Sequence, residues 1–369
     1  MNNERIIFPS YYKSFKCKAG LCSESCCLGW EIDIDGETLE RYKSLQGELG
    51  EKIRKNTATR GDVSHFVMKN RRCPLLNEEN LCEIILSLGE GALCEICREH
   101  PRYYNTLSGV TLGGVGMSCE AAAELIVGQE NPSLYGDITP LLDKDSEDFE
   151  ASALICSALL SAEEILFSDE LSETARLEAM LEQIKLAEDG IFRLYFGLDD
   201  SENGDDVKAK PCASNMESGV DAFGITEIFE GEGSFEPSAI SALKELIPSL
   251  EFMSEKLPEG IMRADLRLAR ERWQGSGEYR RAMLNIAGYL AARYLPMADG
   301  EFSPSSFIFA SLLMLFLLFS ECDATAFEVI SDGENGKAQF KSDEAIRAAV
   351  LFSSEIEYSE ENVEKLNIS

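Results

Sequence analysis

The distribution of cysteines is the feature that most constrains this chain. Nine of its twelve cysteines lie in the first 119 of 369 residues. The nine are Cys17, Cys22, Cys26, Cys27, Cys73, Cys82, Cys94, Cys97 and Cys119. Thiolates are the soft ligands that hold zinc, copper(I) and iron–sulfur clusters. Several linked cysteine segments in one short stretch predict metal ligation rather than isolated buried thiols.

The start of the chain bears on the redox state of these thiols. Residues 1–9 lack the basic start and following apolar run of a secretory signal peptide. We therefore expect a cytoplasmic protein in a reducing compartment, where disulfides are rare. This expectation favours metal ligation or free thiols over a disulfide framework.

The longest apolar run, Phe307 to Phe319, bears on membrane association. Its 13 residues are fewer than the roughly 20 that an α-helix needs to span a bilayer. We expect a buried core helix here and no membrane partner.

The charge is strongly acidic and unevenly placed. The net charge is −32, and most of it lies beyond residue 130. An acidic surface repels a phosphate backbone, so the composition argues against a nucleic-acid partner. The charge can attract a basic partner, or it can serve solubility alone.

The pattern predicts a mainly α fold in two parts. Residues 1–130 read as a Cys-rich metal-binding module with a short β-hairpin, and residues 131–369 as an acidic α-helical domain. Residues 199–231 are polar, acidic and rich in glycine, which predicts a loop or disordered insertion.

Within the first part, Asp35 is placed to cap a helix over residues 36–56. Residues 65–68 read as a strand, and residues 103–117 as a hairpin with a glycine-rich return. Two further helical segments are expected, over residues 82–99 with a break at Gly89–Gly91 and over residues 120–127. In the second part, helices are predicted over residues 150–167, 171–198, 237–256, 261–273, 279–295, 305–322 and 344–354.

Several segments resemble the flagellin lysine-N-methylase family in the order in which that family has them. They include Tyr12 to Asp35 with Cys26-Cys27-Leu-Gly-Trp, Cys73-Pro-Leu-Leu-Asn, Cys94-Glu-Ile-Cys97-Arg-Glu-His-Pro-Arg and Met117-Ser-Cys119. Residues 279–296 resemble an Asn-Tyr-rich helix of that family. There the chain departs from the pattern, because Asn285 and Tyr289 are separated where the family has these residue types adjacent.

A looser similarity concerns the metal ligands alone. The adjacent cysteine pair, the Cys-Pro segment and the Cys-Arg-x-x-Pro segment resemble a broader class of zinc- or iron-chelating modules. Carried over by position, this similarity implies that the core ligands are Cys26, Cys27, Cys73, Cys82 and Cys97. The further candidates are Cys17, Cys22, Cys94 and Cys119. Nine thiols exceed one four-ligand site, so two sites exist or some cysteines have another role.

The family resemblance implies methyl transfer from S-adenosylmethionine to lysine side chains of a protein substrate, with flagellin as the named substrate. The attacking amine must be neutral, whereas a free lysine titrates near about 10.4. The site therefore has to desolvate the lysine or supply a base. Candidates for the base are His100, Tyr103 and Tyr104, which follow the last paired cysteines. Each can equally orient a ligand, pack or lie at the surface.

Three further residues are candidates for holding the methyl donor. Trp30 can stack on adenine or cover the metal site, or it can pack in the core. Arg98 and Arg102 can hold the donor's carboxylate, or they can compensate the charge of a thiolate cluster.

The cofactor expected at the cysteines is an iron–sulfur cluster, with zinc as the alternative. The CxxxCxxC motif common in radical S-adenosylmethionine chemistry is broken here, because Cys27 directly follows Cys26 and Gly29 stands where the third cysteine belongs. Adjacent cysteines strain a single tetrahedral ion, whereas a larger cluster accepts them more easily. Two alternatives to a methylase remain open: a non-catalytic metal-binding interaction protein and an electron-transfer iron–sulfur protein.

Overall fold

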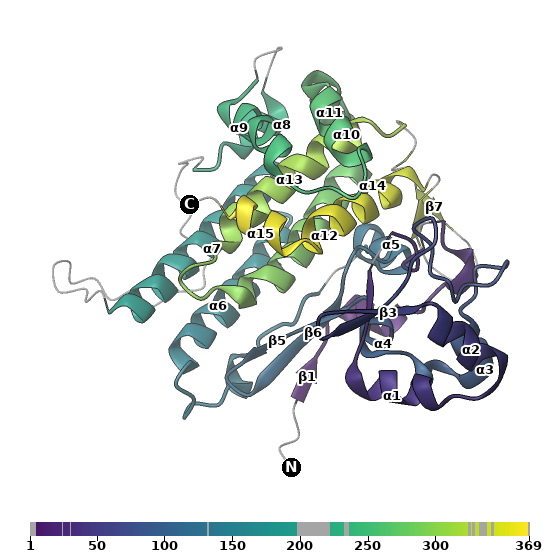
Figure 1. The fold of residues 1–369 in the computed structure, drawn as a ribbon. Helices are drawn as coiled ribbons and strands as arrows, with labels where there is room; N and C mark the ends of the chain where they lie inside the picture. Colours follow the sequence, from purple (N-terminus) through teal and green to yellow (C-terminus); the bar gives the residue numbers. More distant parts are fainter. Residues whose placement is uncertain are drawn as a thin grey trace.

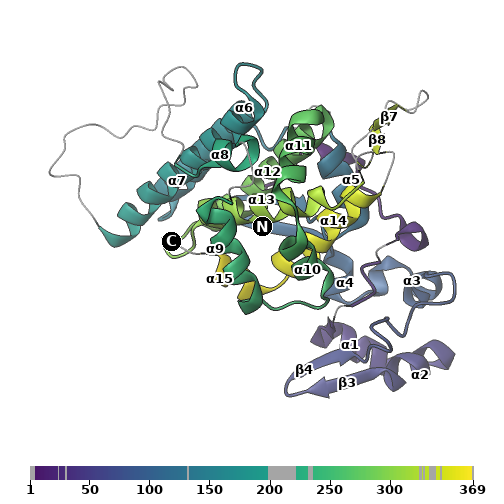
Figure 2. The same ribbon diagram turned by 90° about the horizontal axis from the view of Figure 1, so that it is seen from above.

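A computed structural model describes residues 5–23, 25–29, 31–130, 133–197, 222–231, 236–323, 326, 329–331, 338–340 and 343–367. The fold of these residues is mainly helical with small sheets, as the sequence predicts. Long helices form one side of the molecule, and the cysteine-rich segments with their short helices form the other (Figure 1, Figure 2). Trp30 and most of the insertion predicted over residues 199–231 lie outside the described residues.

The N-terminal third contains short elements. Its strands are β1 (Arg5–Ile7), β2 (Ile32–Ile34), β3 (Thr57–Arg60), β4 (Val63–Phe66), β5 (Arg102–Leu107) and β6 (Val110–Val115). Its α-helices are α1 (Gly36–Ser44), α2 (Gly47–Lys55), α3 (Glu83–Leu88), α4 (Glu95–Glu99) and α5 (Glu120–Gly128). Its 3-10 helices are Ser10–Ser14, Ala19–Leu21 and Glu90–Ala92.

The helix predicted over residues 36–56 is in fact two helices. Asp35 does cap the first, since its Oδ1 accepts from the Thr38 amide at 2.9 Å. The chain then breaks between α1 and α2, where Gly47 adopts a φ of 84° that glycine tolerates best. Arg54 on α2 donates to the Leu45 carbonyl at 2.6 Å and so satisfies a backbone acceptor at the end of α1.

Two three-stranded sheets occupy this third of the chain. In the first, β4 lies between β2 and β3, and both pairings are antiparallel. In the second, β6 lies between β1 and β5, with β1 parallel and β5 antiparallel. The hairpin predicted over residues 103–117 is confirmed as β5 and β6. These two strands and α5 pack into the large core of the helical body, although the sequence placed them with the cysteine-rich module.

The remaining elements form the helical body. Its α-helices are α6 (Phe149–Leu166), α7 (Glu173–Phe196), α8 (Ile225–Glu230), α9 (Ser238–Leu246), α10 (Lys256–Arg263), α11 (Leu266–Gly275), α12 (Gly277–Tyr294), α13 (Pro304–Ser320), α14 (Glu344–Phe352) and α15 (Glu360–Leu366). Shorter elements are the 3-10 helices Thr139–Leu141, Ile247–Ser249 and Leu295–Met297, the π-helix Ser353–Glu357, and the paired strands β7 (Val329–Ser331) and β8 (Ala338–Phe340). The short helix α8 lies within the range where a loop was predicted.

Helix α13 lies at the centre of this body. It carries the apolar run from Phe307 to Phe319, and α7, α10, α11, α12 and α14 pack around it (Figure 1). The expectation of a buried core helix is therefore confirmed. In the described part of the chain, every helix falls short of the length and apolarity that a bilayer crossing needs.

Two predicted helices of the body have different bounds in the structure. The helix predicted over residues 237–256 ends at Leu246, and a 3-10 turn containing Pro248 follows it. The helix predicted over residues 261–273 begins earlier and is interrupted at Ala264. Asp265 starts α11 there by accepting from the Arg267 amide at 2.9 Å. Such a side-chain cap competes with continuation of the preceding helix.

Asp35 provides a test of how the module is held together. Its second oxygen accepts from the Glu95 amide at 2.9 Å, so one carboxylate joins the start of α1 to the start of α4. Loss of both hydrogen bonds in Asp35→Ala should lower the free energy of unfolding by about 1–2 kcal/mol. Asp33→Ala, at an exposed position on β2, should change it by less than about 0.5 kcal/mol. Urea unfolding monitored by circular dichroism measures both; equal effects would contradict this role of Asp35.

Candidate functional site

The nine cysteines singled out from the sequence line one cavity of about 670 Å³, which we call the thiol cavity. They come from five separate stretches of the N-terminal third, none longer than eleven residues. Apolar side chains, among them Ile32, Tyr42, Phe66 and Ile84, form much of the remaining wall. The fold therefore brings together the cysteines that the sequence analysis grouped by spacing alone.

The cysteines form two groups within the cavity. Cys73 and Cys94 are buried in a small hydrophobic core, and Cys27, Cys82 and Cys97 pack against the same core. The second group consists of Cys17, Cys22, Cys26 and Cys119. Their thiols lie close enough that negative charge on Cys17 contributes to a raised pKa of the other three. Cys26 and Cys27, adjacent in sequence and hydrogen-bonded to each other, join the two groups.

Three of the cysteines lie at helix starts, where backbone amides favour a thiolate. Cys82, Cys94 and Cys119 immediately precede α3, α4 and α5. Burial raises the pKa of Cys82 and Cys119, while amides at the starts of α3 and α5 act in the opposite direction. The amides at these helix starts are therefore oriented to stabilise the thiolate form of Cys82 and Cys119.

Within each closely spaced pair, one thiol is favoured as the thiolate. A hydrogen bond from Cys26 lowers the pKa of Cys27 to about 7 against the opposing effect of burial, and Ser25 and Arg72 add to the lowering. A hydrogen bond from Cys97 likewise lowers the pKa of Cys94. Each pair therefore contains one thiol that ionises more readily than its neighbour.

A buried carboxylate fixes the second group against α5. Glu120, in the first turn of α5, accepts from the Lys18 ammonium at 2.7 Å. It also accepts from the Ser23 amide at 2.8 Å and the Ser23 hydroxyl at 2.6 Å. These contacts hold the segment that carries Cys17 and Cys22 beside Cys119.

The chemistry of this donor set fits a thiolate-bound cofactor. Nine thiols surround one cavity, and amides and a cationic Arg72 side chain lie near the sulfurs. In the described residues, however, no three histidine, cysteine, aspartate or glutamate side chains converge closely enough to hold a metal ion. The fold therefore brings the thiols to one cavity, and no three of the described side chains form a complete ligand set.

The candidates for acid–base chemistry and donor binding lie in different places. His100, Arg98 and Arg102 line the thiol cavity, whereas Tyr103 and Tyr104 are absent from its described lining. Tyr103 is directed from β5 into the helical body, where its ring lies 5.2 Å from the Arg293 guanidinium. Tyr104 is 43% exposed.

The cationic candidates are held differently. Arg102 donates to the Tyr12 hydroxyl at 3.0 Å, and its guanidinium lies over the Phe15 ring. Arg98 is exposed and pairs with Glu99 at 3.1 Å. Arg102 is thus oriented by its neighbours, while Arg98 is in contact with solvent at the rim.

Sequence reasoning missed the cationic side chain that lies behind the cavity. Arg293 on α12 donates to the Tyr289 hydroxyl at 2.8 Å and lies 3.4 Å from Glu357. Its guanidinium also lies 5.1 Å from the ring of Tyr358, which lines the thiol cavity beside His100. The segment 279–296 was noted for its family resemblance, but nothing in its spacing distinguishes Arg293 from a surface arginine.

Comparisons with known proteins give three distant relatives. The chain is 25% identical over 145 residues to the Flagellar biosynthetic protein FliU of Salmonella muenchen, a match covering 37% of this chain and 85% of that protein. It is 25% identical over 135 residues to a Lysine-N-methylase of Salmonella typhimurium, covering 34% of this chain and 33% of that protein. A Lysine-N-methylase of Salmonella choleraesuis matches to the same extent.

These similarities are weak and partial. The match spans about a third of each methylase, 33% of its length. The chain matches no family model and no solved structure. A distant relation to lysine-N-methylases over about a third of the chain is what the comparisons support.

The protonation state of His100 provides a test of the cavity's interior. Burial, together with the charges of Arg293 and Arg102, lowers the pKa of His100 from 6.5 to about 4. Between these pH values the unfolded chain binds a proton at this residue that the folded chain does not, so acidification should destabilise the fold through His100. In His100→Gln the unfolding free energy should therefore fall less steeply from pH 6.5 to 4.5. Nitrogen chemical shifts of the ring should report a neutral imidazole at pH 5.5; a protonated ring there would contradict the burial.

Proposed function

We propose that this protein is an S-adenosylmethionine-dependent methylase that modifies lysine side chains of a protein substrate, with flagellin as the first candidate. The observation that carries the proposal is the 25% identity to two Lysine-N-methylases. Similarity to a flagellar biosynthetic protein supports a flagellar substrate. The thiol cavity, which gathers all nine N-terminal cysteines, supports this part of the chain as the reaction site.

The cavity wall can prepare the lysine for attack. An ammonium that enters an apolar cavity loses hydration, and this loss favours the neutral amine that can accept a methyl group. His100 lies in the wall and is neutral at ordinary pH, so a ring nitrogen can accept the proton. Its low pKa makes it a weak base. Desolvation by the surrounding apolar side chains therefore contributes most to the deprotonation.

Two arginines in the cavity lining suit the methyl donor. Arg102 is oriented by Tyr12 and Phe15, and Arg98 lies at the rim. A guanidinium can hold the carboxylate of the donor's methionine part through paired hydrogen bonds. We assign Arg102 the main role, because its geometry is already set by its neighbours, and Arg98 a supporting one.

We further propose that the cysteines hold an iron–sulfur cluster, with zinc as the alternative. The group of Cys27, Cys73, Cys82, Cys94 and Cys97 is the better candidate, because these thiols share one hydrophobic core. These five side chains would hold the cluster, which would supply a redox-active centre that thiols alone do not provide. The protein's own part is to keep water away and to orient the donor and the acceptor.

Cysteine variants test whether the proposed reaction depends on this group. Anaerobically prepared protein, given methyl-labelled S-adenosylmethionine and flagellin, should produce methyl-lysine that mass spectrometry detects. Cys27→Ser and Cys97→Ser should each lower the rate at least about tenfold and reduce bound iron and sulfide. Cys156→Ser, a buried position on α6 outside the cavity, should keep both within about twofold.

The outcomes separate the proposal from its alternatives. Bound iron and sulfide without donor binding by calorimetry would favour a metal-binding interaction protein. A reversible absorption change on reduction, without methyl transfer, would favour electron transfer. Methyl transfer that survives both Cys27→Ser and Cys97→Ser would contradict a role for this cysteine group in catalysis.

A further inference from the structure

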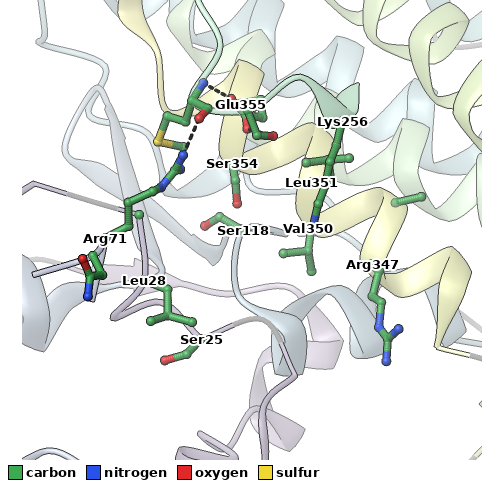
Figure 3. A pocket seen from close by; sticks show the side chains of 15 residues that line it. Ser25, Leu28, Arg71, Ser118, Lys256, Arg347, Val350, Leu351, Ser354 and Glu355 are labelled. Atoms are coloured by element: carbon green, nitrogen blue, oxygen red, sulfur yellow. Dashed lines mark hydrogen bonds between the residues drawn. The ribbon is translucent and has the colours of Figure 1, made fainter. Parts of the chain in front are cut away.

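A second cavity of about 580 Å³ lies between the cysteine-rich segments and the helical body (Figure 3). One wall comes from residues 25, 28–29, 70–71 and 118, and the other from residues 253, 254 and 256, from α14 and from the π-helix that follows it. Its volume is in the range of small-molecule sites. We call it the cleft cavity.

The cleft cavity gathers positive charge in a chain of net charge −32. Arg71, Lys256 and Arg347 line it and come from three distant parts of the sequence. Among the described residues, Lys256 has no acidic side chain within ion-pair distance, and Arg347 has only exposed Asp343 at 3.9 Å. Such exposed pairs contribute little, so the two cations remain available to a ligand.

The one carboxylate in the described lining is already engaged. Glu355 accepts from the Met253 amide at 2.6 Å and from the Ser254 hydroxyl at 2.9 Å. These two hydrogen bonds partly offset the negative charge of Glu355. The lining thus holds three cationic side chains and one carboxylate, and that carboxylate is hydrogen-bonded to its own wall.

A buried hydroxyl in the lining has no hydrogen-bond partner in the described part of the chain. Ser118 is 3% exposed, its Oγ is unpaired, and Figure 3 shows its side chain directed into the cavity. Leaving a buried polar group unsatisfied costs about 1–3 kcal/mol. A ligand oxygen at this position would satisfy it.

The backbone beside Gly29 places Arg71 at the cavity. Asn70 and Arg71 have φ values of 52° and 60°, a left-handed conformation that asparagine tolerates and that is costly for arginine. A Cβ on Gly29 would lie 3.2 Å from the Arg71 guanidinium, so the glycine leaves room for it. Arg71 then donates to the Met253 carbonyl across the cavity.

We propose that the cleft cavity binds a small organic anion, a carboxylate or phosphate ester carried on an apolar group. Lys256, Arg347 and the Ser118 hydroxyl bind the anionic end. Leu28, Met253 and Leu351 offer the apolar wall for the rest of the molecule. This binding goes beyond the proposed methyl transfer and does not depend on it.

Calorimetry on the full chain tests the proposal with adenosine monophosphate as the phosphate probe and indole-3-acetate as the carboxylate probe. Adenosine is the neutral control. At least one anion should bind with a dissociation constant in the millimolar range or below, and adenosine should bind at least tenfold more weakly than its monophosphate. Raising the salt concentration should weaken binding, because exposed charges are screened.

Matched variants locate the binding. The double variant Lys256→Gln, Arg347→Gln should weaken it at least tenfold, and Ser118→Ala a few-fold. Arg263→Gln, an exposed position on α10 outside the cavity lining, should leave it unchanged. Thermal unfolding of each variant checks the fold.

Each outcome has a defined meaning. Binding of one probe alone identifies a phosphate or a carboxylate ligand, and binding of both identifies a general anion site. The proposal is overturned if neither anion binds at millimolar concentration, or if the double variant and Arg263→Gln behave alike. Methyl transfer without anion binding would reject this proposal and leave the proposed function standing.

Discussion

The buried ion pair of Arg293 and Glu357 lies inside the helical body, where the β5–β6 hairpin packs against α12. Its side chains are 13% and 0% exposed, so both charges depend on nearby polar groups. Glu357 accepts from the hydroxyls of Tyr289 and Tyr294 at 2.8 and 3.1 Å. The Arg293 carbonyl accepts from Asn105 on β5 at 2.9 Å, so the same residue anchors the hairpin to α12. Removing either charge would leave the other buried without its opposite charge.

This pair also sets the environment of the thiol cavity. The Arg293 charge contributes to keeping His100 neutral, and Tyr358 follows directly after Glu357 and lines the cavity. A side chain at Gly116 would bring its Cβ to 2.8 Å from the Arg293 guanidinium, which explains a glycine two residues before Ser118. The helical body therefore does more than support the cysteine-rich segments, because it supplies part of the cavity's electrostatics.

Sequence periodicity predicted most of the helices and the β5–β6 hairpin, because local apolar patterns and turn residues determine them. It missed the break at Gly47 and the cap at Asp265, where single residues override a continuous pattern. The nine cysteines that the sequence singled out line one cavity, and their role as metal ligands stays a prediction. The sequence could not predict the role of Arg293 or the cleft cavity. The cavity forms only when segments far apart in the chain pack together, and these segments carry Arg71, Lys256 and Arg347.

The thiol cavity and the cleft cavity lie on either side of the same chain segments. Ser25 lines both, and the residues that follow divide between them: Cys26 and Cys27 face the thiol cavity, while Leu28 and Gly29 face the cleft cavity. Likewise, Ser118 lines the cleft cavity and Cys119 lines the thiol cavity. An anion held by the Ser118 hydroxyl therefore lies one residue away from Cys119, which lines the thiol cavity. Binding free energies are reciprocal, so if anion binding shifts this thiol, its ligation must alter anion affinity by the same factor.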